Sequence, residues 1–139
     1  GRRAKGANMR FEDLDVWKKS ARLACEIYKA TADLKDWGFR DQITRSALSI
    51  SSNIAEGFER DSHRDCARFL AIAKGSCGEV RSQLYIAQEI GFLKAEQAKS
   101  WRDESLSISR MLSALITKRR EYADEVSDDL EDYNSRNLQ

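Results

Sequence analysis

The chain has 139 residues, 34% of them charged, and it contains no proline, seven glycines and three cysteines. This length supports one domain with its own core, and the absence of proline beside plentiful Ala, Leu, Lys, Arg and Glu favours helix. No apolar run reaches the roughly 18 residues that a membrane helix needs, no secretory signal is apparent, and an odd number of cysteines argues against a disulfide framework, so we expect a cytoplasmic protein.

The formal net charge is +1, but it is spread unevenly along the chain. Residues 9–120 carry +4, residues 121–139 carry −6, and the first eight residues add +3. We interpret residues 1–8 as a tag remnant, residues 9–122 as a helical bundle and residues 123–139 as an acidic, disordered tail.

A long helix is predicted from Phe11 to Leu34, because apolar residues recur there at steps of three and four. They form two neighbouring lines, of which one can face the bundle and the other a second subunit. The first line holds Leu14, Trp17, Ala21, Ala24, Tyr28 and Thr31, and the second holds Val16, Leu23, Ile27, Ala30 and Leu34.

The second helix, predicted from Asp41 to Gly57, is rich in Ser and Ala and has an apolar arc at Ile43, Ala47, Ile50 and Ile54. Gly57 is a candidate C-terminal cap. Polar residues line the arc beside the apolar one, and we expect them to form a buried network with the third helix, in which Arg45 or Asn53 reaches Glu79 or Gln83. The predicted network comprises Gln42, Arg45, Ser49, Asn53, Glu56 and Glu79.

The third helix is predicted from His63 to Ile90, with Ser62 and Asp65 as a start of the capping-box type. Gly75 and Gly78 lie in its middle, where we expect another helix to pass close; a kink or a ligand near the backbone is the alternative. The fourth helix follows a turn at Gly91 to Lys94, begins its apolar line at Ala98 and is expected to fray after Tyr122. Four helices with short links predict an all-α, up-down-up-down antiparallel four-helix bundle.

Residues for catalysis are scarce. His63 is the only histidine, and no spacing suits a zinc or di-iron site, a nucleophile elbow, a phosphate loop or a dinucleotide site. Cys66 and Cys77 share one helix face and are expected in the core. The sequence therefore predicts a protein that is not an enzyme and has no cofactor.

Basic residues suggest contacts to nucleic acid, which needs cations gathered on one surface. A plain solvated surface is the alternative, and assembly of several copies would strengthen a weak patch. The candidate contacts are Lys18, Lys19, Arg22, Arg60, Arg64, Arg68, Lys118, Arg119 and Arg120.

The chain carries three motifs in order: Phe11-x-x-Leu14-x-x-Trp17; Gln42-x-x-Arg45-x-Ala47-x-Ser49-Ile50-x-x-Asn53-Ile54-Ala55-Glu56-Gly57; and Arg68-Phe69-Leu70-x-Ile72-Ala73-x-Gly75-Ser76-x-x-Glu79. Over residues 9–120 they resemble the bacterial four-helix bundle family named for open reading frames in the intervening sequences of 23S ribosomal RNA genes. The resemblance implies a cytoplasmic homopentamer with a role in binding RNA or DNA. Its fold is shared with accessory proteins of diversity-generating retroelements, in which a basic pentamer associates with a reverse transcriptase and nucleic acid.

Three hypotheses follow. The first is a non-enzymatic homo-oligomeric bundle, a pentamer by the resemblance, that binds RNA or another nucleic acid. The second is a protein-interaction subunit for a nucleic-acid enzyme such as a reverse transcriptase. The third is an enzyme or small-molecule carrier that uses a pocket near Gly75 and Gly78.

Overall fold

A computed structural model describes residues 9–137, which form four α-helices and one short 3₁₀-helix. The elements are η1 (Phe11–Asp13), α1 (Asp15–Thr31), α2 (Trp37–Phe58), α3 (His63–Glu89) and α4 (Ala95–Asn137). The part of the chain that the structure describes contains no strand and no helix long and apolar enough to cross a membrane. The predicted tag remnant, residues 1–8, lies outside the described residues.

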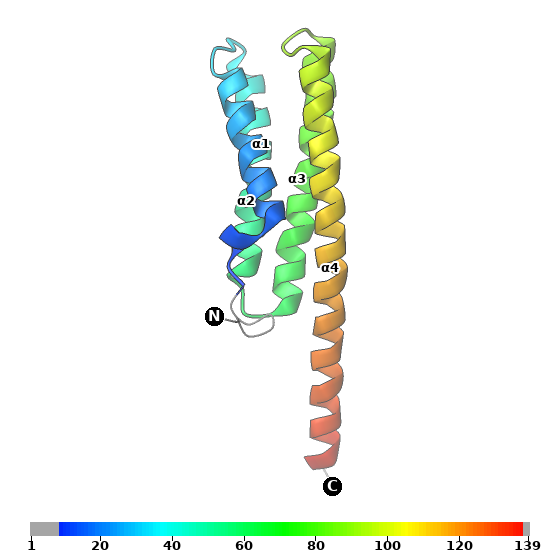
Figure 1. Ribbon diagram of the computed structural model, residues 1–139. Coiled ribbons are helices and arrows are strands. Elements are labelled where there is room, and N and C mark those ends of the chain that lie inside the picture. The colour runs from blue at the N-terminus through cyan, green and yellow to red at the C-terminus, as the bar shows by residue number, and fades with distance from the viewer. Residues whose placement is uncertain (1–8, 138–139) are drawn as a thin grey trace.

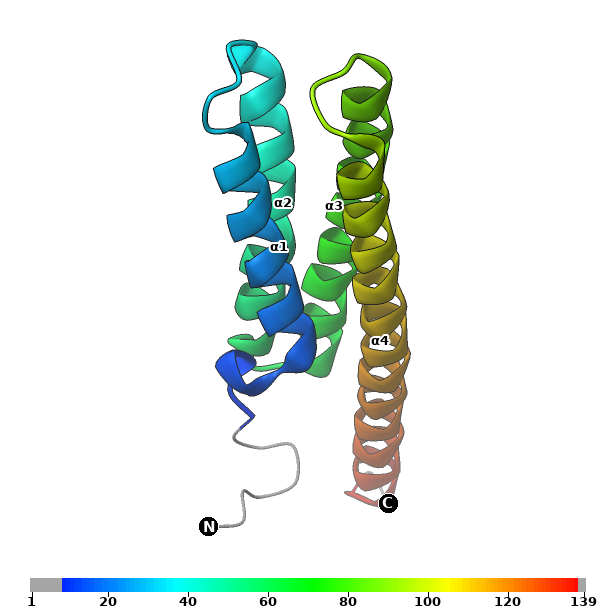
Figure 2. The same cartoon turned by 45° about the horizontal axis from the view of Figure 1, so that its top comes forward.

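Consecutive helices run in opposite directions, joined by residues 32–36, 59–62 and 90–94 (Figure 1). Helix α3 packs mainly against α2 and α4, whereas α1 packs against α2 and more lightly against α4. The view in Figure 2 shows the α1–α2 pair beside the α3–α4 pair. This arrangement confirms the predicted all-α, up-down-up-down antiparallel four-helix bundle.

Local capping contacts fix where α2 begins and where α3 begins and ends. The Asp36 side chain accepts a hydrogen bond from the Phe39 amide at the start of α2. Ser62 accepts one from the Asp65 amide at the start of α3, a cap that the sequence predicts. Helix α3 ends at Glu89, and two residues later Gly91 has a φ of +82°, which favours glycine. The amides of residues 91 and 92 then return to the Gln88 and Ala87 carbonyls, which completes a Schellman motif.

Several predicted boundaries are wrong. Helix α1 covers Asp15–Thr31 rather than Phe11 to Leu34, because Phe11–Asp13 form the separate η1. Helix α2 starts at Trp37 rather than Asp41, because the Asp36 cap lies earlier than the apolar pattern suggests. Helix α4 continues to Asn137, so the segment expected to be a disordered tail is helical as far as the structure describes it. No glycine or proline interrupts α4, and nothing in its sequence stops the helix at Tyr122.

The core is a single cluster of buried aliphatic side chains from all four helices, with Leu23, Ile50, Leu84 and Leu112 among its fully buried members. Both apolar lines of α1 take part in it. The buried residues are Ala24 and Thr31 from the first line and Val16, Leu23 and Ile27 from the second. Helix α1 therefore has no complete apolar line left for another subunit, contrary to the prediction.

Gly57 is a contact point between α2 and α3, not a C-terminal cap as predicted. It is buried inside α2, and a Cβ added to it would lie 3.1 Å from Phe69 Cβ and 3.2 Å from the Cys66 carbonyl oxygen. A glycine is needed here because α3 passes too close for a side chain. The helix itself ends at Phe58.

Candidate nucleic-acid interface

A row of short polar side chains joins α2 to α3. The hydroxyls of Ser49 and Ser76 lie 2.8 Å apart, and the Asn53 amide donates to the Ser49 hydroxyl at 3.0 Å. Farther along, Gln83 Nε2 donates to the Ser46 hydroxyl at 3.1 Å. The Ser46 hydroxyl in turn donates a hydrogen bond to Glu79 Oε2 at 3.2 Å. The serines, rather than long side chains, carry the contact between the two helices.

The expected bridge from Arg45 or Asn53 to Glu79 or Gln83 is therefore wrong in its partners. Arg45 is exposed on α2, and Asn53 bonds within its own helix. The helices approach closely along the row, so a serine hydroxyl spans the gap while a guanidinium turns to water, where its charge is solvated at no penalty.

The other predicted members of the network lie at its edge or outside it. Gln42 is exposed and contributes only its backbone carbonyl, which accepts from Ser46 at 2.9 Å. Glu56 is exposed and pairs with Arg60 at 2.8 Å. Glu79 is exposed as a residue, although one of its carboxylate oxygens contacts Ser46. The polar row joins α2 to α3 through hydrogen bonds of 2.8 to 3.2 Å.

Gly75 and Gly78 face open space, contrary to the expectation that a helix passes close to both. A Cβ on Gly75 would meet nothing within 4 Å, and one on Gly78 would meet only the Arg81 guanidinium at 3.8 Å. Gly75 instead lies on the wall of a hollow between α3 and α4.

Two adjoining hollows, of about 410 and 320 Å³, share Ala71 and Arg120 and make one continuous depression along α3 and α4. We call it the α3–α4 groove. Its α3 wall carries Arg64, Ala67, Arg68, Ala71, Lys74 and Gly75, and its α4 wall carries Ser113, Ile116, Thr117, Arg120, Ala123 and Asp124.

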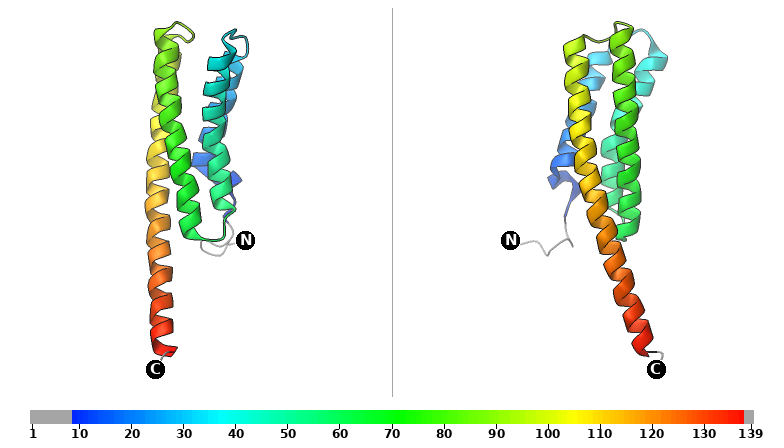
Figure 3. Two further views of the ribbon diagram at one scale, coloured as in Figure 1. Left: turned by 180° about the vertical axis from the view of Figure 1, so that it is seen from behind. Right: turned by 90° about the vertical axis from the view of Figure 1, so that its right-hand side faces the viewer.

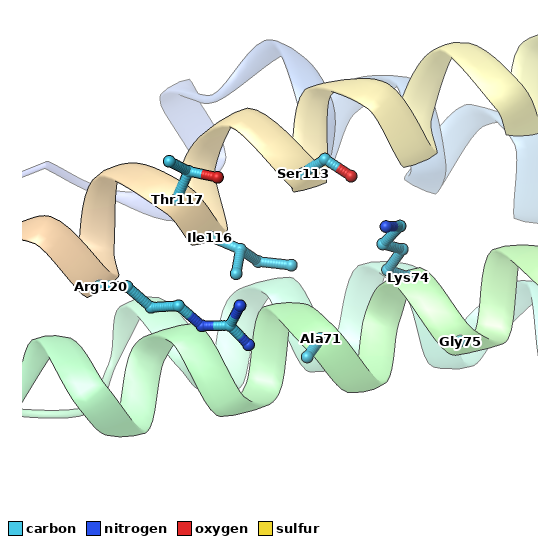
Figure 4. Close-up of a pocket in the computed structure, with 7 residues that line it drawn as sticks. All are labelled: Ala71, Lys74, Gly75, Ser113, Ile116, Thr117 and Arg120. Atoms are coloured by element: carbon cyan, nitrogen blue, oxygen red, sulfur yellow. The ribbon is translucent and has the colours of Figure 1, made fainter.

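Four cations border the α3–α4 groove against one acid, Asp124. Figure 4 shows Lys74 rising from α3 and Arg120 extending from α4 into the space between the helices. Arg68 lies one turn before Ala71 on the same face of α3, and Arg64 lies two turns before it. All four basic residues are exposed; Arg68 also lies 3.9 Å from Asp65 and 4.7 Å from the Phe69 ring centroid, so its charge already has partners within α3.

Three of the nine predicted contacts thus meet in this groove: Arg64, Arg68 and Arg120. Lys74 joins them but escaped the sequence analysis. The helical spacing of Arg64, Arg68 and Ala71 points to the turn that holds Lys74, yet only the position of α4 shows that this turn borders a groove.

Arg60 and Arg119 sit beside the groove but already have partners. Arg60 pairs with Glu56, and its guanidinium lies 4.7 Å from the Phe69 ring centroid. Arg119 is half-buried, donates to His63 Nδ1 at 3.0 Å and stacks over another aromatic ring. Both hold the base of the bundle together, which leaves them less free to bind a phosphate.

The remaining predicted cations lie elsewhere. Lys18, Lys19 and Arg22 are on α1, and Arg22 pairs with Glu104 of α4 at 3.0 Å. Glu104 and the groove residue Ser113 are nine positions apart, which places them on opposite sides of α4 at about 100° per residue. Lys118 is exposed on α4, outside the groove lining.

The groove offers positive charge and small side chains rather than reactive groups. Burial raises the pKa of the Cys66 thiol, and burial raises that of Cys77 to about 11, so both are protonated at neutral pH. Within residues 9–137 no three His, Cys, Asp or Glu side chains gather as a metal site would require. Such a surface suits an extended polyanion held at its phosphates.

Comparison with a family model and with solved structures finds similar proteins. The family model described as the 23S rRNA-intervening sequence protein matches residues 12–114. A solved structure from Bacteroides thetaiotaomicron, described as a protein of unknown function from the S23 ribosomal protein family, is similar with 30% identity and a TM-score of 0.68. The similarity covers 73% of this chain and 97% of that one. No curated protein matches.

The family match includes all of α1, α2 and α3 and the first half of α4, together with the serine row and the α3 wall of the groove. The chain belongs to the family of 23S rRNA-intervening sequence proteins.

Proposed function

We propose that this protein is a non-enzymatic, homo-oligomeric bundle that binds structured RNA through the α3–α4 groove. The observation that carries the proposal is the convergence of Arg64, Arg68, Lys74 and Arg120 on one exposed groove. Phosphate contacts supply most of the affinity of sequence-independent binding, and they need cations along one path rather than scattered over the surface. The relation to 23S rRNA genes in the family description makes RNA the first ligand to test.

The dimensions of the groove support a nucleic-acid backbone rather than a single small anion. Ten residues of helix separate Arg64 from Lys74, a rise of about 15 Å. A shallow wall of Ala71, Gly75 and Ser113 leaves room for a ribose-phosphate chain to approach the helix backbones.

Assembly is the second part of the proposal, with five copies as the resemblance implies. Exposed apolar side chains gather on α2 and α3, flanking the serine row: Leu48, Ile72, Ile86 and Ile90 are between 44 and 52% exposed. Apolar surface of this kind favours association, because burial removes it from water. In a ring, each copy adds one groove, so weak phosphate contacts sum.

Fluorescence anisotropy of a labelled, structured RNA over a salt series tests the RNA claim. Neutralising Arg64, Arg68 and Arg120 to Gln should flatten the slope of log affinity against log salt by about 2, because each lost phosphate contact removes roughly 0.7–0.9. The matched control neutralises three exposed cations at the opposite end of the bundle: Lys29, Lys35 and Lys94.

Equal losses in both triple variants would mean that only net charge matters and that the groove is not the site. Absence of binding at about 50 mM salt, where counterion release favours it most, would overturn the RNA claim.

Light scattering and sedimentation test the assembly. Ile72→Lys and Ile86→Lys together should yield a smaller species, whereas Tyr28→Lys on α1 should leave the oligomer intact. A monomeric wild-type chain at micromolar concentration would refute the assembly, and dissociation by Tyr28→Lys alone would move the interface to α1.

A further inference from the structure

The end of α4 presents an apolar face that no part of the described chain covers. The buried positions of α4 alternate by four and three, through Ser105, Ser109, Leu112 and Ile116. The same steps continue beyond the bundle to Ala123, Val126, Leu130 and Tyr133, where the last three are 55, 60 and 66% exposed. We call residues 124–137, all of them exposed, the α4 extension. Its first residues, Asp124, Val126 and Ser127, still border the start of α3. Figure 3 shows no other helix beside the rest of the extension.

A repeat of four and three is the pattern of a helix that packs against another helix. Inside the bundle, α4 packs against α1 and α3. In the α4 extension the same pattern continues, but beyond its first residues no helix packs against it. The extension also lies outside residues 12–114, the part matched by the family model, so it is a feature of this chain beyond the shared bundle.

The charge of the extension indicates what kind of partner it fits. Residues 124–137 hold six acids and one arginine, a net charge of −5. Beside the apolar steps runs an acidic stripe, Glu121, Glu125, Asp128 and Asp132, on one side of the helix because its members are four, three and four residues apart. Such a helix complements a groove that is basic and lined by small side chains.

The α3–α4 groove has these properties. Its positions Arg64, Arg68, Ala71 and Gly75 step by four, three and four, the spacing of the acidic stripe, and both series span about 16 Å. A Cβ added to Gly75 would meet nothing within 4 Å, so there is room for the backbone of an incoming helix. Lys74 and Arg120 add two further cations.

The groove must belong to a second copy. Within one chain the extension continues α4 in a straight line away from the bundle (Figures 1 and 3). No glycine or proline lies between Ala95 and Asn137 to let it fold back. We propose that the α4 extension of one copy docks in the α3–α4 groove of another copy and there competes with RNA; the competition, though not the docking, rests on the proposed function.

Cross-linking tests the docking without RNA. All variants carry Cys25→Ser, since Cys25 is the exposed cysteine. A chain with Ala71→Cys in the groove is mixed with a chain carrying Asp129→Cys, between the apolar steps and the acidic stripe, and treated with a bis-maleimide. The matched control replaces Asp129→Cys by Glu131→Cys, which also removes one acid but lies about 200° round the same helix.

We expect a heterodimer several-fold more abundant with Asp129→Cys than with Glu131→Cys, and its loss in high salt. Equal yields would overturn the docking. Efficient cross-linking of the Asp129→Cys chain to itself would also overturn it, because two extensions would then pair with each other.

Competition is tested by neutralising the acidic stripe in the full chain (Glu121→Gln, Glu125→Gln, Asp128→Asn and Asp132→Asn) and measuring RNA affinity. If nine-tenths of the grooves are occupied by extensions, the apparent affinity should rise about tenfold. The control removes four exposed acids at the opposite end of the bundle: Asp33→Asn, Asp41→Asn, Glu89→Gln and Glu96→Gln.

An equal rise in RNA affinity in the control variant would refute competition, because the change in net charge alone would then explain both results. If no variant binds RNA, the proposed function fails, while the cross-linking result still decides the docking.

Discussion

Replacing Gly57 by alanine should destabilise the bundle relative to the same change at Gly75. Gly75 lies in the interior of α3, where the substitution gains roughly 1 kcal/mol of helix propensity, whereas Gly57 is the last residue but one of α2, where the gain is smaller. They differ in what the new methyl group meets: at Gly57 it meets Phe69 Cβ at 3.1 Å and the Cys66 carbonyl oxygen at 3.2 Å, and at Gly75 it meets nothing within 4 Å.

The crowding at Gly57 has no easy relief. One of the two crowded atoms is backbone and the other is a Cβ, so no rotamer change moves either of them. Helix α3 must shift by a few tenths of an ångström, and overpacking of this kind costs about 1–3 kcal/mol. The difference between the variants therefore combines this packing cost with the smaller propensity gain at Gly57.

Urea denaturation followed by circular dichroism, at one fixed protein concentration, gives the free energy of unfolding of each variant. We expect Gly75→Ala to be about 1 kcal/mol more stable than wild type and Gly57→Ala to lie about 1–3 kcal/mol below Gly75→Ala. Equal stabilisation by both substitutions would refute the close approach of α2 and α3 at Gly57.

Three further predictions concern individual contacts. Ser105→Ala removes the hydroxyl that donates to the Cys77 carbonyl at 3.0 Å and should cost about 0.5–1.5 kcal/mol by urea denaturation. Trp101→Phe removes the hydrogen bond to Glu26 at 2.9 Å and should cost about 1 kcal/mol, whereas an additional Glu26→Gln should then add little. A thiol reagent should modify Cys25 at once and Cys77 only on unfolding. Burial raises the pKa of Cys77 from 9.0 to about 11, so the folded state favours the protonated thiol. The stability that the buried thiol contributes is complete below pH 9 and should be lost as the pH rises towards 11.

Features decided by local chemistry could be predicted from the sequence. The period of the apolar residues gives four helices, and the Ser62 cap follows from its side chain and the amide three residues on. The extent of α4 was missed because acidic, polar composition suggested disorder, although no residue in it breaks a helix.

Features decided by packing could not be predicted in the same way. A helical wheel places Arg45 beside the apolar arc, but it does not reveal how closely α3 approaches α2. Because the two helices lie close together, the long Arg45 side chain extends into solvent. Gly57 and Gly75 look alike in sequence, yet one is crowded and the other is open. Lys74 became a site residue only when α4 was seen to form the opposite wall.

The serine row gives the bundle a defined register. Aliphatic side chains pack nearly as well after a helix slides by one turn, about 5.4 Å, but hydroxyl pairs do not. Such a slip of α3 along α2 would separate Ser49 from Ser76 and leave buried polar atoms unpaired. The serine row therefore selects one alignment of the α1–α2 hairpin against the α3–α4 hairpin. That alignment also fixes the position of each basic residue of α3 along the bundle axis.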